Sequence, residues 1–201
     1  MSLVRPALIT ALVLWLLTVT LGTLQAAPKV PTAGCVVHHL SVRLDPAGHR
    51  LTGVDRMVVT NPPERLQLRL APQAKIASIS VDNREATWRQ RNGRLEIPLP
   101  SSGGGPLTVT VTYSAIFDDA PTEQPVNTDN PGYGVSGTIS ERGTVLLAGA
   151  GWYPRVEGLE RSIHLAVTAP AGVLAVTSGQ LEGHTTAGGD SLSRWHVTRP
   201  T

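Results

Sequence analysis

The sequence predicts an all-β fold, a β-sandwich of two layers of antiparallel strands, and two observations support the prediction. From residue 35 onward, apolar and polar side chains alternate with a period of two, the pattern of a strand with one buried face. Short strand-like segments recur about every ten residues with turn residues between them, as in β-sandwiches. No segment after Pro31 has a sustained helical period.

The predicted strands follow one another closely along the chain. The first covers residues 37–45 and is joined by a turn at Asp45–His49 to a hairpin partner at 50–59. Asn92-Gly93 marks a tight turn between two later strands. The remaining strands are expected at residues 65–71, 75–81, 85–90, 94–99, 107–115, 144–149, 162–170, 173–179 and 191–198.

The segment from Phe117 to Arg142 interrupts this rhythm with three prolines, three glycines and no apolar alternation. Loops this long are usually functional or disordered. Its adjacent carboxylates, Asp118 and Asp119, could serve acid–base chemistry or calcium binding, or be merely solvated. A docking role and a mobile surface excursion are both open interpretations of this loop.

The N-terminal residues have the features of an export signal. Arg5 is followed by an apolar run at 7–24 and then by small residues, which predicts a signal peptide over residues 1–26. A retained membrane anchor is the alternative, because the run is near the minimum length for a membrane span. We therefore expect an exported protein, either periplasmic, secreted or cell-envelope associated, with a linker at 27–34 and a β-sandwich domain at 35–201.

Charge and cysteine content exclude several classes of protein. The net charge of +2, from 17 basic and 15 acidic residues without a basic run, gives no support for nucleic-acid binding. Cys35 is the single cysteine, so no internal disulfide can form. The preceding "TAGC" is weakly similar to a lipidation motif, and an ordinary cysteine at a strand edge is the alternative.

No catalytic or metal-binding constellation is found in the sequence. His38 and His39 are consecutive on a predicted strand and therefore point to opposite faces of the sheet. The chain contains no His-Glu-x-x-His and no Gly-x-Ser-x-Gly motif. We therefore expect no catalytic residue, no metal ligand and no cofactor in these 201 residues.

Aromatic residues give the more specific indication. Alternation assigns Trp88 and Trp195 to core or inter-sheet packing. In Trp152-Tyr153-Pro154, by contrast, neighbouring side chains diverge, so one ring could fill the core while the other packs against a neighbour. A free-standing aromatic platform for sugars or peptides is the alternative.

Several stretches together resemble one known family. "HLSVRLDPAGHRLTG" resembles its first hairpin, with Leu-x-Gly at the end; "LTVTVTYSA" resembles its long strand ending in Tyr and a small residue. "GWYPRVEGLERSIHLAVTAPAGVLAVTSGQL" and "SRWHVTRP" are similar to its Phe-Pro element and last strand. The chain thus resembles, over residues 37–200, the N-terminal β domain of zinc aminopeptidases typified by aminopeptidase N and leukotriene A4 hydrolase. Tyr153-Pro154 stands where the family commonly has Phe-Pro.

The resemblance implies a non-catalytic domain of an exported zinc metallopeptidase. Such a domain would brace a following catalytic domain, which would hold the zinc, and form part of the wall of a peptide-substrate cavity. Its partners would be that domain and, indirectly, a peptide; a membrane would be involved only through an uncleaved N-terminal segment. The implied docking candidates are Trp152, Tyr153, Pro154 and Trp195, and the candidates on the substrate side are Asp118, Asp119 and Tyr133.

Two other classes of function are open on the sequence alone. The chain could be a stand-alone periplasmic or surface binding module that uses the loop at 117–142 and Trp152-Tyr153 as its contact surface. It could also be a surface lipoprotein anchored at Cys35.

Overall fold

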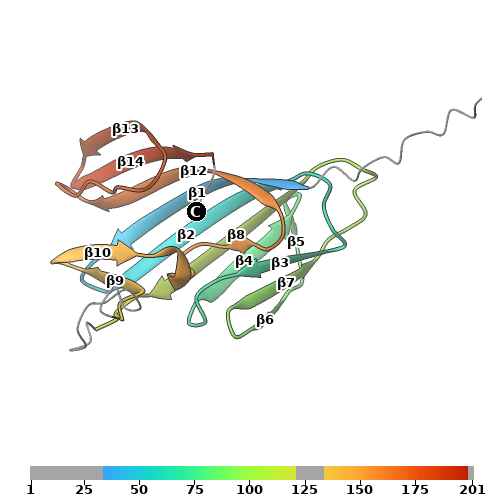
Figure 1. The fold of residues 1–201 in the computed structure, drawn as a ribbon, viewed down its shortest axis with the longest axis horizontal. Coiled ribbons are helices and arrows are strands. Elements are labelled where there is room, and N and C mark those ends of the chain that lie inside the picture. Colours follow the sequence, from blue (N-terminus) through green and yellow to red (C-terminus); the bar gives the residue numbers. More distant parts are fainter. Residues whose placement is uncertain (1–33, 121–133, 199–201) are drawn as a thin grey trace, which may run out of the picture. The chain divides into compact units, whose positions relative to one another are not determined.

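The computed structural model describes residues 34–120 and 134–198, and the regular structure in them is almost entirely β (Figure 1). The all-β prediction is confirmed. Eight strands form the large sheet, in the spatial order β13-β14-β12-β1-β2-β8-β4-β5. Their bounds are β1 Cys35–Asp45, β2 Arg50–Val59, β4 Lys75–Val81, β5 Arg84–Glu85, β8 Leu107–Ile116, β12 Glu160–Pro170, β13 Gln180–Ala187 and β14 Asp190–Val197. The predicted signal peptide lies outside the described residues.

Two smaller sheets complete the fold. One has four strands in the order β11-β3-β7-β6, and the other is a two-stranded hairpin, β10-β9. A single turn of 3-10 helix, η1 (Ala148–Ala150), follows the hairpin. The bounds of these strands are β3 Arg65–Arg69, β6 Arg89–Arg91, β7 Arg94–Pro98, β9 Gly137–Ser140, β10 Gly143–Leu146 and β11 Arg155–Val156.

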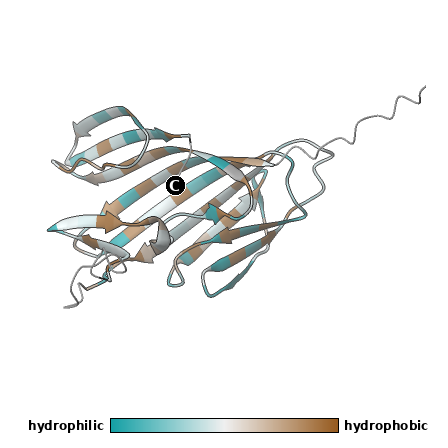
Figure 2. Ribbon diagram, in the orientation of Figure 1, coloured by the Kyte–Doolittle hydropathy of each residue, from teal (hydrophilic) through white to brown (hydrophobic). Residues whose placement is uncertain are grey.

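One hydrophobic core lies between the large sheet and the four-stranded sheet. Along β1, β2 and β8 every second residue is buried, so these strands turn one face to the core. Figure 2 shows hydrophobic residues interspersed with hydrophilic ones along the strands of the sheet. The core face joins β3 and β7 in a single cluster that includes Leu40, Met57 and Val111 from the large sheet and Leu66 and Ile97 from the small one. Burial of these side chains drives the two layers together, at about 1.5–3 kcal/mol for each large apolar residue.

The large sheet is not purely antiparallel as the sequence predicted. β1 and β12 run parallel, in a register that pairs Cys35 with Glu160 and Arg43 with Thr168. Parallel neighbours need a long connection, and here it contains the whole chain from β2 to β11. The large sheet therefore consists of two antiparallel groups, β1-β2-β8-β4-β5 and β12-β14-β13, that join along β1 and β12.

Most strands are found at their predicted places, and β2 and β4 match to the residue. The tight turn at Asn92-Gly93 is also confirmed, since both residues have positive φ. The strand predicted at 173–179 is wrong, because those residues have no strand partner. The structure instead places a strand at Gln180–Ala187, which the sequence did not indicate.

A glycine in β2, Gly53, makes room for the ring of Tyr113. Gly53 pairs across the sheet with Tyr113 of β8, and a Cβ at Gly53 would lie 2.5 Å from Cζ of the tyrosine ring. Atoms cannot approach that closely, so the ring can lie over this strand only because the residue is glycine. The glycine of the Leu-x-Gly pattern and the tyrosine near the end of the later strand are therefore partners in one contact.

Replacing Gly53 with alanine is expected to lower the free energy of unfolding by about 1–3 kcal/mol, as overpacking does in well-packed cores. Urea unfolding would measure the loss. Gly183→Ala on β13 is the matched control, because no atom lies within 4 Å of a Cβ built there. Equal effects of the two substitutions would contradict the steric explanation.

Candidate functional site

The loop that contains Trp152-Tyr153-Pro154 is fixed to the four-stranded side of the domain at Gly151. Gly151 has a φ of 66°, and a Cβ there would lie 2.6 Å from the backbone nitrogen of Ala71. The Ala71 N–H donates to the Gly151 carbonyl oxygen at 2.7 Å. Both the left-handed backbone and this close approach favour glycine, so the loop begins at a fixed point.

Tyr113 holds the same loop from the large sheet. Its hydroxyl donates a hydrogen bond of 2.9 Å to the carbonyl oxygen of Trp152. Burial, together with nearby Asp55 and Tyr153, raises the pKa of Tyr113 well above its ordinary value. The phenol therefore keeps its proton and acts as a permanent donor.

A buried polar pair lies next to this tyrosine. His38 Nδ1 and Asp55 Oδ2 are 2.7 Å apart, and both side chains are completely shielded from solvent. The ring of His38 meets that of Tyr153 edge to face, with centroids 6.0 Å apart. The pair thus joins β1 to β2 and supports the second aromatic residue of the loop.

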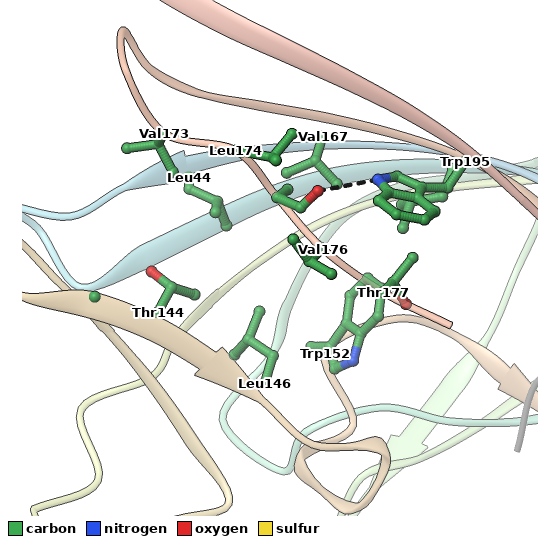
Figure 3. Close-up of a pocket in the computed structure, with 13 residues that line it drawn as sticks. Leu44, Thr144, Leu146, Trp152, Val167, Val173, Leu174, Val176, Thr177 and Trp195 are labelled. Atoms are coloured by element: carbon green, nitrogen blue, oxygen red, sulfur yellow. Dashed lines mark hydrogen bonds between the residues drawn. The ribbon is translucent and has the colours of Figure 1, made fainter. Parts of the chain in front are cut away.

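An apolar groove of about 400 Å³ runs beside the loop (Figure 3). In that view, Thr144 and Leu146 of β10 lie across the groove from Val173 and Leu174 of the segment that precedes β13. The remaining residues that line it are Leu44, Gly143, Trp152, Leu165, Val167, Ala175, Val176, Thr177 and Trp195. Trp195 Nε1 donates to the Ala175 carbonyl oxygen at 3.0 Å, which fixes the segment that forms one wall.

Two further hollows extend this groove at its ends. One of about 210 Å³ shares Leu146, Trp152 and Thr177 with it, and one of about 590 Å³ shares Leu44 and Thr144. Exposed apolar side chains line the groove and its neighbouring hollows: Val176 is 75% exposed, and the others are Leu147, Val173 and Leu174. A continuous apolar surface of this kind is typical of a binding or docking site.

The structure separates the four predicted docking residues. Trp152 is half-buried and lines the groove, whereas Tyr153, Pro154 and Trp195 are buried in the domain's own core. Trp195 nevertheless reaches the groove with one surface, next to Val176. Docking by these residues stays a prediction, and Trp152 is the member of the set with the most accessible side chain.

The predicted substrate-side carboxylates have different environments. Asp119 accepts hydrogen bonds of 2.8 Å from the N–H groups of Ser136 and Gly137, and this fastens the base of the loop. Asp118 is 65% exposed and lies 3.4 Å from His49 Nδ1. Tyr133 lies outside the described residues, so the third member of that set stays a prediction.

Apart from Trp152 and Trp195, the residues that line the groove were not predicted from the sequence. Val173–Val176 were interpreted as a strand because apolar runs bounded by turn residues usually are. The signal that could have indicated a loop is the neighbouring Pro170 and Gly172, because proline and glycine often mark the end of a strand.

Residues 34–120 and 134–198 contain neither a cluster of metal ligands nor a membrane-spanning helix. In these two ranges no group of three or more His, Cys, Asp or Glu side chains is arranged to hold a metal ion. The same ranges contain no helix with the length and apolar character of a membrane span. Cys35 begins β1, where its Sγ lies 3.0 Å from Thr60 Oγ1.

Comparison with solved structures identifies proteins that share this fold. The chain is similar to an M1 zinc metallopeptidase from Deinococcus radiodurans, with 20% identity and a TM-score of 0.55 over 83% of this chain and 39% of that one. A two-domain M1 zinc metallopeptidase mutant bound to L-tryptophan gives 18% identity and a TM-score of 0.58, over 83% and 40%. Yeast LTA4 hydrolase in complex with bestatin gives 13% and 0.53, over 82% and 26%.

These likenesses show the fold of the chain. The chain spans about two fifths of the first two structures and about a quarter of the third. No family model matches the sequence, and no significant match is found among curated proteins. The fold is thus that of one part of M1 metallopeptidases, and the activity of a whole enzyme is a separate question.

Removing either member of the His38–Asp55 pair is expected to destabilise the domain strongly. His38→Leu or Asp55→Leu should each cost about 3–5 kcal/mol, because the remaining polar group is buried without its partner. The double variant should lose much less than the two losses combined, since neither polar group remains. Urea unfolding of the unsubstituted protein, the two single variants and the double variant measures this coupling.

The exposed pair Arg43–Asp190, joined at 2.8 Å, is the matched control. Arg43→Leu, Asp190→Leu and their double variant should barely change the urea midpoint. Strictly additive losses at His38 and Asp55 would refute the coupling.

Proposed function

We propose that this chain is a non-catalytic β domain of an exported, aminopeptidase-like zinc metallopeptidase. The single observation that carries the proposal is the fold, which matches part of several M1 zinc metallopeptidases over more than four fifths of this chain. The signal-like residues 1–26 support export to the periplasm, the cell envelope or the medium. In such a protein the zinc and the residues that cleave the peptide bond belong to another domain.

The groove supports a bracing role for the domain. The groove and the hollow beside it expose four apolar side chains, and Val176 is the most exposed of them. Covering such an apolar surface removes it from water and lowers the free energy of the protein. We assign this surface to contact with the catalytic domain of the same polypeptide, with Trp152 as the aromatic anchor.

A substrate-side role is assigned to the neighbouring loop. Asp119 fastens the base of the segment that includes Tyr133, and Asp118 keeps its carboxylate exposed beside it. A carboxylate at the edge of a peptide cavity would attract the free amino group of a peptide. We therefore propose that this loop forms part of the cavity wall and contacts the peptide without taking part in bond cleavage.

The test of the proposed function begins with the coding DNA downstream of codon 201. A reading frame that continues and encodes His-Glu-x-x-His with a later glutamate supports the proposal. A stop codon after Thr201 would refute it and favour a stand-alone module that binds a ligand in the groove. In that case, tryptophan fluorescence from Trp152 would report ligand binding.

Within a longer polypeptide, Val176→Asp is expected to weaken the contact between domains. The substitution should change the stability of the present chain by less than about 0.5 kcal/mol, because the side chain is exposed. In the longer protein it should lower the first thermal transition by about 2–4 °C and reduce peptidase activity. Differential scanning calorimetry and hydrolysis of an aminoacyl anilide would measure the two effects.

Val54→Asp is the matched control, because Val54 is also an exposed valine, 43% accessible, but points away from the core face of the large sheet. The same loss of activity in both variants would contradict docking through the groove.

A further inference from the structure

Three histidines form a row across the outer face of the large sheet, opposite the core. His39 of β1 pairs directly with His164 of β12, and His164 pairs with His196 of β14. The ring centroids are 5.1 and 4.4 Å apart, and the ring planes are parallel within 7° and 5°. We call these three stacked side chains the histidine ladder.

The ladder borders a shallow hollow of about 200 Å³. His39 and His164 line this hollow together with Ser41, Glu182 and Arg194. The hollow thus combines two imidazoles, a guanidinium and a hydroxyl with one opposing carboxylate. No residue of this set has a role in the groove, which lies on the other face of the sheet.

Neighbouring strands add positive charge around the ladder. Arg56 of β2 lies directly opposite His39 in the sheet register. Glu182 of β13 is the acidic group lining the hollow, while Asp55 and His38 lie on the core face of the sheet. When the imidazoles are protonated, cations therefore outnumber the one carboxylate.

Without a ligand, His39 of the ladder resists protonation. Burial lowers the pKa of His39 below its ordinary value, and the charges of His164 and Arg56 lower it further, while Asp55 opposes the shift. An anion bound beside His39 would favour the protonated imidazole and so oppose this lowering of the pKa. Proton uptake and anion binding are therefore linked in this site.

The ring geometry does not suit a shared metal ion. A metal must lie close to the plane of each imidazole that binds it, along the nitrogen lone pair. Planes that are parallel and more than 4 Å apart do not meet at such a point. Oxygens of one oxyanion, by contrast, can accept separate N–H bonds of about 2.7–2.9 Å from neighbouring rings.

We propose that the hollow beside the histidine ladder binds a phosphate group, with His39, His164 and Arg194 as its donors. A phosphate group carries up to two negative charges and at least three acceptor oxygens, so it can accept from all three side chains together. Ser41 supplies a hydroxyl at the same hollow, and Glu182 sets an upper limit on the affinity by opposing the anion. Binding that protonates His39 is strengthened by acid.

The test follows the imidazole signals by NMR during titration of the purified protein with inorganic phosphate, at constant ionic strength. Affinity is expected to be at least tenfold higher at about pH 6 than at about pH 8, and phosphate should raise the titration midpoint of His39. His164→Gln should reduce affinity about tenfold, and Glu182→Gln should increase it. His39→Gln repeats the first test if His164→Gln does not fold.

His184→Gln is the matched control, because His184 is exposed and hydrogen-bonds Ser193 on the other face of the sheet. Equal loss of affinity in His184→Gln, equal affinity at the two pH values, or acetate binding as tight as phosphate would overturn the proposal. Vesicles containing phosphatidic acid distinguish the source of the group: binding to them in preference to inorganic phosphate assigns the site to a lipid headgroup. Binding of inorganic phosphate alone assigns it to a soluble ligand.

Discussion

The close approach of Tyr113 to the backbone of Gly53 is the contact on which the loop and the groove beside it depend. Because Gly53 has no Cβ, the ring lies across β2 and its hydroxyl reaches the carbonyl of Trp152. That bond, with the Ala71–Gly151 bond on the other side, fixes the position of the loop. The position of Trp152 in the groove thus depends on the missing Cβ of Gly53 on β2.

The buried pair adds specificity to a core whose stability comes from apolar burial. Leucines, valines and isoleucines of the two sheets would pack in more than one register if hydrophobicity alone decided. His38 and Asp55 make their 2.7 Å contact only when β1 and β2 are correctly aligned, and the ring of Tyr153 meets the histidine ring edge to face. The polar contact therefore links the alignment of two strands to the position of the aromatic loop.

The sequence predicted most of the strands that have one buried face, but it missed β9 (Gly137–Ser140), which lies in the segment predicted as a loop. β2 and β4 were predicted to the residue because their alternation is regular, while β13 was missed because nearly every residue in it is exposed and Gly183 adjoins a register shift. Trp152 was predicted as a site residue, but the burial of Tyr153 and Trp195 depends on tertiary packing. The histidine ladder could not be predicted, because His39 meets His164 only through the parallel register of β1 and β12.

The parallel pairing of β1 and β12 also determines when the domain can be completed during synthesis. β1 can pair with β2 as soon as the first hairpin emerges, but its other edge has no partner until residues 160–170 have been made. During that interval the edge of β1 offers unpaired backbone groups to any other chain. A chain-length delay of this kind makes a folding intermediate vulnerable to aggregation and favours assistance by a chaperone until β12 arrives.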